Sequence, residues 1–169
     1  MSQFPTFILY PDPTLRAAAA IRPVDAALRA TGSALLSAAE SHRVYGLAAA
    51  HIGQVEPVIV ISVAPPEARD YRVLYNPRIV ETGGSLVSGT EGSVSLPGIE
   101  VEISRPDHAS VAYDDADGAP RTLSLEGFAA RVALHETEQV NGIFFLTHLS
   151  RLKRDAALRR FQKLSRDQK

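Results

Sequence analysis

The sequence predicts an α+β fold in a single domain that spans residues 1–169. The first observation is the order of the elements, which starts with a helical segment, continues through several short strand-like runs and ends with two further helical segments. The second is the absence of internal repeats and low-complexity linkers, which leaves no candidate domain boundary. A chain of 169 residues with 45% hydrophobic content is also long enough to bury one core.

The elements are predicted in order from the local pattern. Residues 25–43 are rich in Ala and Leu and predict the first helix. Residues 45–54, "YGLAAAHIGQ", predict an apolar turn marked by glycine. Short apolar or alternating runs, most of them bounded by Pro, Gly or Asp, then predict strands at 57–63, 71–77, 84–97, 99–104, 108–115 and 120–125. The sequence "DDADG" predicts the turn between the last two.

A second helix is predicted for the stretch "ARVALHETEQVNG", Ala130 to Gly142. Its positions i, i+4, i+7 and i+11 form one stripe that should face the core, and these positions are Phe128, Val132, His135 and Gln139. Asn141 and Gly142 are typical of a helix C-terminus.

The same helix carries an incomplete metal-binding pattern. In a HExxH motif, two histidines one turn apart bind zinc and the glutamate acts as general base. His135 and Glu136 match the start of that pattern, but Gln139 stands where the second histidine belongs. His135 and Glu136 are therefore candidate site residues, although a lone histidine on an apolar face is more often part of a core.

The last predicted helix is basic. Residues 151–169 hold eight Lys and Arg against two Asp, a net charge of +6, whereas the rest of the chain carries −7. Ala157, Phe161 and Leu164 lie at i, i+4 and i+7, which predicts an amphipathic helix with one packed stripe and a basic outer face. A solvated surface helix is the ordinary interpretation of such a pattern.

Composition excludes several classes of function. The overall net charge of −1 argues against specific DNA binding by the chain. The absence of Cys excludes disulfides, thiolate metal ligands and a cysteine nucleophile. The N-terminus lacks the features of a signal peptide and no run is long enough to span a bilayer. We therefore expect a soluble cytoplasmic protein without a membrane partner.

Three motifs give the chain a resemblance to a known family. "VYGLAAAHIG" (44–53), "EGSVSLPG" (91–98) and "HETEQVNG" (135–142) resemble, in order and spacing, the GxGxAAPQ, EGCxS and HExxH motifs of the peptide deformylases. The segments between them are also similar, so the resemblance covers nearly the whole chain. It implies a peptide-deformylase fold, with an antiparallel β-rich body around a buried HExxH-type helix and a C-terminal helix. It also implies the family's role in translation, the metal-dependent removal of the formyl group from N-formylmethionine of nascent polypeptides.

The departures from the family pattern fall at the metal ligands. In the family, a cysteine thiolate and both histidines of HExxH hold a divalent metal. The resemblance assigns these positions to Ser93, His135 and Gln139. A hydroxyl and an amide are poor substitutes for a thiolate and an imidazole, so only His135 is expected to be retained as a ligand. We therefore expect a degenerate member with weak or no conventional deformylase activity and no cofactor.

The first motif has also changed. Val44 replaces its opening glycine, and because a valine disfavours the positive φ open to glycine, we expect a different path for this loop. His51 replaces the glutamine that, by the resemblance, donates a hydrogen bond to the developing oxyanion. The backbone N–H of Val94 would be the second donor, and an imidazole N–H can take the place of the amide.

Other positions match the family. Glu136 keeps the general acid/base position, and Gly46 and Gly92 match residues that shape the substrate cleft. Glu91 and Arg105 resemble an ion pair that braces the strand bearing the cysteine, which fold stability alone would explain.

Two alternative functions would make the chain an active enzyme. The first is an active amide hydrolase for formyl or other N-acyl peptides, whose rebuilt site holds weakly bound zinc or iron through His51 and His135. The Glu138 carboxylate or the Gln139 oxygen would be its third donor. The second is a serine hydrolase that uses Ser93 with either histidine, although the sequence lacks a GxSxG pattern.

The basic C-terminal segment adds a possible partner. In composition and position, residues 151–169 resemble a Lys- and Arg-rich helix that docks family members on the ribosome near the tunnel exit. The resemblance implies the ribosome as a partner beside the N-formyl or N-acyl peptide.

Overall fold

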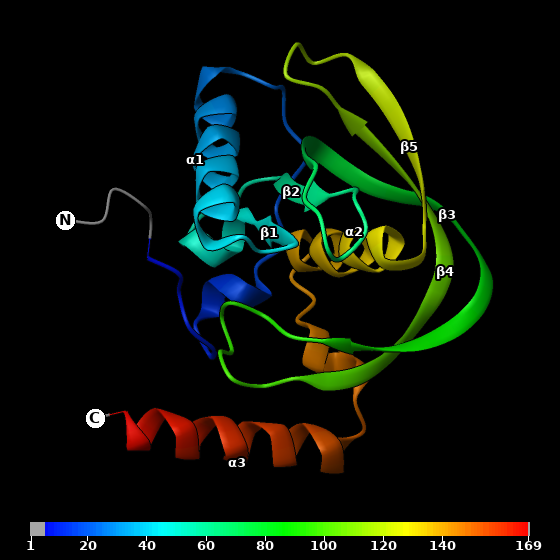
Figure 1. The fold of residues 1–169 in the computed structure, drawn as a ribbon. Coiled ribbons are helices and arrows are strands. Elements are labelled where there is room, and N and C mark those ends of the chain that lie inside the picture. The colour runs from blue at the N-terminus through cyan, green and yellow to red at the C-terminus, as the bar shows by residue number, and fades with distance from the viewer. Residues whose placement is uncertain (1–5, 169) are drawn as a thin grey trace.

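The computed structural model describes residues 6–168, which form one antiparallel sheet and three α-helices (Figure 1). The helices are α1 (Ala26–His42), α2 (Gly127–Val140) and α3 (Arg151–Asp167). The strands are β1 (Gly46–Ala48), β2 (Val58–Ser62), β3 (Tyr71–Glu91), β4 (Val101–Asp114) and β5 (Pro120–Glu126). Short 3-10 turns lie at η1 (Pro13–Arg16), η2 (Ala49–Ile52) and η3 (Phe145–His148). The predicted α+β class is confirmed.

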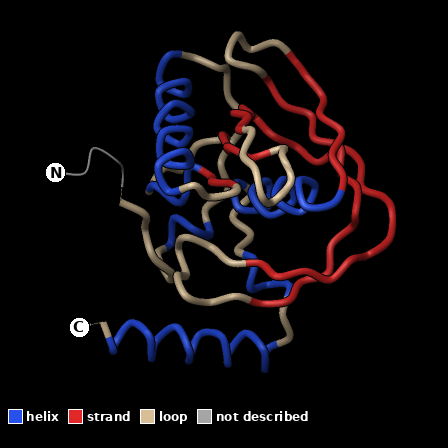
Figure 2. Tube along the Cα trace, in the orientation of Figure 1, coloured by secondary structure: helices blue, strands red, loops and turns tan. Residues whose placement is uncertain are grey.

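The sheet follows the order of the chain, β1-β2-β3-β4-β5, and every neighbouring pair is antiparallel. Strands β3 and β4 are much longer than the others and pair from Tyr75 with Asp114 to Glu91 with Val101. Figures 1 and 2 show this pair curving around α2 toward the side of α3. The curved pair therefore encloses the buried helix and brings the end of β3 beside it.

Four of the predicted strands merge in pairs, so that the structure has two long strands in their place. The runs 71–77 and 84–97 join into β3, and the runs 99–104 and 108–115 join into β4. Pro77 and Gly84 do not end β3 because the pairing shifts register between Tyr75 and Arg78 and between Gly83 and Leu86. Such bulges tolerate Pro and Gly and bend the strand.

The predicted bounds of one strand, 84–97, and of one turn, 45–54, were also wrong. Residues 92–97 leave the sheet, and the N–H of Leu96 closes a turn on the carbonyl of Ser93. The predicted turn at 45–54 contains β1 and η2. Strand β1 is only three residues long and its pairing with β2 depends on distant residues, so the local pattern did not indicate it.

Helix α1 starts and ends with recognisable caps. The side chain of Asp25 accepts a hydrogen bond from the N–H of Leu28, as an N-cap residue does. The helix ends at Arg43, which adopts the left-handed conformation with φ 53°. The chain then enters β1 through Val44, so the left-handed residue lies one position before the valine that replaces the family's glycine.

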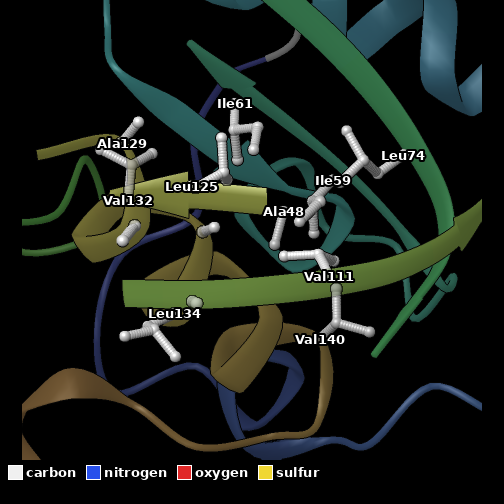
Figure 3. Close-up of a cluster of buried hydrophobic side chains, with 13 residues drawn as sticks. Ala48, Ile59, Ile61, Leu74, Val111, Leu125, Ala129, Val132, Leu134 and Val140 are labelled. Carbon is white, nitrogen blue, oxygen red and sulfur yellow. The ribbon is translucent and has the colours of Figure 1, made fainter. Parts of the chain in front are cut away.

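One of the three buried apolar clusters in the described residues lies between α2 and the sheet. Figure 3 shows side chains from β1, β2, β3, β4 and β5 packed against the apolar side of α2. On the predicted stripe of α2, Val132, His135 and Gln139 are buried and Phe128 is half-buried. Most other side chains of the helix are buried too, so α2 lies inside the molecule and burial does not single out the stripe. The predicted stop is confirmed, because Asn141 caps the helix and Gly142 has φ 77°. A Cβ at Gly142 would lie 2.5 Å from the carbonyl oxygen of Arg16.

Helix α3 crosses one end of the molecule (Figure 1). Ser150 caps its first turn, and Ala157 and Phe161 are buried in a cluster that includes Leu15 and Leu96. Leu164 is partly buried on the same side, so the predicted amphipathic pattern is confirmed. Within residues 6–168, no helix is both long and apolar enough to cross a membrane.

Candidate functional site

A cavity of about 420 Å³ lies over the N-terminal half of α2. Its walls come from the residues around β1, from the end of β3 with the loop that follows, and from α2 itself. Most of the predicted site residues line it, namely Gly46, His51, Gly92, Ser93, Val94, His135 and Glu136. Gln139 does not line this cavity.

A buried network centred on Glu91 forms the floor of the cavity. Arg105 donates to both oxygens of Glu91, from Nε to Oε2 at 2.6 Å and from Nη2 to Oε1 at 2.9 Å. Nδ1 of His135 lies 2.7 Å from Oε1. Burial would raise the pKa of Glu91, but the hydrogen bonds from His135 and Arg105 outweigh it and lower the pKa to about 2. The predicted Glu91–Arg105 ion pair is thus present, and it also orients His135.

Arg131 is a site residue that sequence reasoning missed. Its Nη1 donates to Glu91 Oε2 at 2.8 Å and to the carbonyl of Ile103 at 2.8 Å, while Nη2 donates to the carbonyl of Val87 at 2.7 Å. A Cβ at Gly89 would lie 2.8 Å from the Cζ of Arg131, so the glycine leaves room for the guanidinium. The available signal was spacing, because Arg131 precedes His135 by one helical turn.

His135 and Glu136 face each other at the centre of the site. Nε2 of His135 lies 4.0 Å from Oε1 of Glu136. Burial would lower the pKa of His135, but the Glu91 hydrogen bond and the nearby Glu136 charge raise it overall. For Glu136 itself, burial raises the pKa to about 7, and Oε2 has no hydrogen-bond partner within residues 6–168. The helix therefore places an imidazole whose pKa is raised beside a carboxyl group that can hold a proton near neutral pH.

His51 is neutral and presents one free donor. Its Nδ1 accepts the N–H of Ala48 at 3.0 Å, so the proton of the neutral ring is on Nε2. Nε2 is buried and has no partner in the described part of the chain. Burial, reinforced by the charge of His135, lowers the pKa of His51 to about 3.

Gly46 brings β1 into direct contact with α2. A Cβ at this position would lie 2.8 Å from the Cγ of Glu136 and from Cγ1 of Val132. Any larger side chain would therefore push against the helix that carries Glu136.

The side chains that the resemblance assigns to two of the metal positions are engaged in other contacts. Oγ of Ser93 accepts the N–H of Ser95 at 3.1 Å. Nε2 of Gln139 donates to the carbonyl of Leu15 at 2.7 Å. Within residues 6–168, no three His, Asp or Glu side chains form a group that could hold a metal ion. The residues present therefore do not fit a divalent metal bound in the family's manner.

Of the two third donors predicted for a rebuilt metal site, Glu138 is engaged in other contacts and the Gln139 oxygen is not. Glu138 accepts from Nη1 of Arg105 at 3.0 Å, and its other oxygen lies 2.8 Å from Nε2 of His148. Glu138 could bind a metal beside His51 and His135 only by giving up its contact with Arg105, so its use as a ligand stays a prediction. Gln139 keeps its Oε1 without a partner, but this atom is buried away from the cavity.

The serine-hydrolase alternative lacks its hydrogen-bonded pair. Among the described residues, no hydrogen bond joins Ser93 to either histidine: Nδ1 of His135 faces Glu91, and Nδ1 of His51 accepts from Ala48. A serine nucleophile needs a base within hydrogen-bond reach.

The comparisons with known proteins agree with this architecture. The family model described as polypeptide deformylase matches residues 5–155. A peptide deformylase-like protein of Rhizobium meliloti (strain 1021) is 38% identical over 160 residues, which cover 94% of this chain and 92% of that protein. A peptide deformylase of Mesorhizobium japonicum is 35% identical over 162 residues and covers 95% and 92%. The crystal structure of peptide deformylase from Ehrlichia chaffeensis superimposes with a TM-score of 0.89 at 27% identity, over 98% of this chain and 99% of that chain.

The fold and its cleft are thus those of a hydrolase family that acts on N-formyl peptides. The chain belongs to the peptide deformylase family.

Proposed function

We propose that this chain is a degenerate peptide deformylase-like protein that binds N-formyl or N-acyl peptide ends with weak or no metal-dependent hydrolysis. The observation that carries the proposal is the state of the former ligand positions. Gln139 donates to Leu15 and Ser93 accepts from Ser95, which leaves His135 as the one imidazole at those positions. A catalytic zinc site needs three protein donors of adequate basicity.

Binding of the blocked peptide end depends on groups that the cavity retains. The free Nε2–H of His51 and the backbone N–H of Val94 would donate to the acyl carbonyl oxygen. Glu136, adjacent to both histidines, would accept the N–H of the amide. In this proposal His51 and Glu136 hold the positions of the family's catalytic groups, and the side chains of Phe128 and Val132 supply an apolar wall for the first residue.

The competing hypothesis is an active amide hydrolase with a metal held by His51 and His135. It would need a third donor, and the engagement of Glu138 with Arg105 disfavours the nearest carboxylate that the sequence offered. The two hypotheses differ in a quantity that can be measured directly, the metal content of the purified protein.

We therefore expect protein purified without chelator to hold zinc, iron or nickel at well below one equivalent and to hydrolyse formyl-Met-Ala peptides poorly or not at all. Elemental analysis and a formyl-peptide hydrolysis assay should be run on the same preparation. Titration calorimetry with formyl-Met-Ala then tests whether the peptide binds without being cleaved. A stoichiometric, tightly held metal together with turnover would favour the rebuilt hydrolase instead.

We also propose that α3 serves as a ribosome-docking element. Its exposed face carries Arg159, Arg160 and Lys163, away from the buried Ala157 and Phe161. A basic face on an otherwise acidic chain favours contact with RNA phosphates through counterion release.

A further inference from the structure

A second cavity opens beside the first. It has a volume of about 630 Å³, and the two cavities share Thr90, Gly92, Ser93 and Glu100. Its walls are the end of β3, the loop before β4, the start of β4 and one residue of α3, Arg160. The shared residues place the two cavities side by side, with Ser93 at their junction.

The docking of α3 fixes Arg160 at this place. Phe161, the next residue, is buried in the core beneath the helix. One turn further on, Leu164 packs against the loop, where a Cβ at Gly98 would lie 3.0 Å from the Leu164 Cδ1. Gly98 also has φ 80°, so a larger residue would strain the loop and press on the helix at once. Figure 1 shows this loop, which joins β3 to β4, running close to α3.

The charged groups of the second cavity differ in whether they have hydrogen-bond or ion-pair partners. Glu102 accepts from Oγ1 of Thr90 at 2.5 Å and from Oγ of Ser88 at 3.0 Å, so its carboxylate is engaged. Arg160 and Glu100 are exposed, and neither has a hydrogen bond or ion pair within residues 6–168. The far wall therefore offers a free guanidinium, and the junction between the cavities carries a free carboxylate.

We propose that the two cavities form one groove for a short N-blocked peptide, whose carboxylate is bound by Arg160 of the C-terminal helix. The inference rests on the proposed function, because it takes the blocked end to lie against His51 and Glu136 in the first cavity. A guanidinium matches a carboxylate with two parallel hydrogen bonds. Glu100 repels a carboxylate at the junction, so the negative charge is favoured only at the Arg160 end of the groove.

The assignment gives α3 a role in ligand selection. The groove would distinguish short peptides with a free carboxylate, or with an acidic side chain at the same distance, from peptides that are neutral there. Arg159 is equally exposed on the neighbouring position of the helix but does not line the cavity, so it serves as a matched control.

The test uses the full chain and two peptide lengths, formyl-Met-Ala-Ser and formyl-Met-Ala-Ser-Ala, each as free acid and as C-terminal carboxamide. Titration calorimetry should give a roughly two- to fivefold tighter Kd for the acid at one length or both, the range expected for a partly exposed ion pair. Arg160→Gln should abolish that preference and Arg159→Gln should keep it. Glu100→Gln should increase the preference for the acid, because the Glu100 carboxylate no longer repels the carboxylate of the peptide.

The binding results separate a failure of the groove assignment from a failure of the proposed function. If acid and amide bind wild type equally at both lengths, or if Arg160→Gln keeps the preference, the groove assignment is overturned while peptide binding in the first cavity stands. If no peptide of the series binds wild type, the proposed function itself fails and the assignment falls with it.

Discussion

At the scale of single residues, Gln139 connects two distant segments of the fold. Its amide joins the end of α2 to the carbonyl of Leu15 in η1, inside the core. A buried carbonyl left without a donor costs about 1 to 3 kcal/mol. The Gln139 side chain thus supplies a structural hydrogen bond at the position that the resemblance assigns to a histidine ligand.

We expect the double variant Ser93→Cys/Gln139→His to restore binding of a divalent metal. A thiolate and a second imidazole would then join His135, which gives the three protein donors that a tetrahedral site requires. Each single variant should bind far less metal, since two donors leave the ion largely hydrated. Elemental analysis after dialysis measures this, and circular dichroism checks that each variant is folded. A folded double variant that remains free of metal would show that the side chains at these positions do not converge.

At the scale of elements, Tyr71 connects the start of β3 to the end of α1 and to the loop that enters the cleft. Its hydroxyl lies 3.0 Å from the carbonyl oxygen of Ala39 and 2.7 Å from that of Val44. Burial raises the pKa of Tyr71, against a smaller opposing effect of the Arg69 charge. The protonated hydroxyl is thus favoured in the folded state.

We expect Tyr71→Phe to lower the free energy of unfolding by about 1 kcal/mol near neutral pH, the usual value of one hydrogen bond. Because the folded pKa is raised, this contribution is complete below the unfolded pKa of about 10 and is lost as pH rises through the folded pKa. Urea unfolding near neutral pH and above pH ~10 measures both effects. Tyr113→Phe is the control, and an equal alkaline loss of stability in wild type and Tyr71→Phe would contradict the assignment.

At the scale of the whole molecule, charge is strongly divided. The segment 151–169 carries +6 and the remainder −7, and the structure places most of the basic side chains on the exposed side of α3. The buried contacts of Ala157 and Phe161 hold this side outward. An exposed basic helix on an acidic body is suited to a partner of high negative charge.

We expect the protein to co-sediment with ribosomes at low salt and to be released steeply between roughly 50 and 200 mM salt. The variant with Arg159, Arg160 and Lys163 changed to Glu should stay folded and remain in the supernatant. A control with the same charge change on the sheet, at Arg72, Arg78 and Arg121, should still sediment. Sedimentation of both variants alike would leave α3 as a solubilising surface only.

Much of the fold could be predicted from local sequence. Helix α2, its stop at Asn141 and Gly142, and the packed face of α3 follow from spacing and capping chemistry, which act within a few residues. The lengths of β3 and β4 could not be predicted, because Pro77, Gly84 and Pro106 are turn residues by local rules. Only the pairing of the two strands, with its register shifts, makes them compatible with continuous strands.

For the site, the sequence by itself determined most of the residues that line the cleft, but not Arg131. The tertiary structure alone decided what the remaining polar groups do. Gln139 bonds to a carbonyl 124 residues away, and Glu91 reaches His135 across 44 residues. A buried polar group must find a hydrogen-bond partner, and the partner it takes depends on which distant segments the fold brings into contact, which no local pattern specifies.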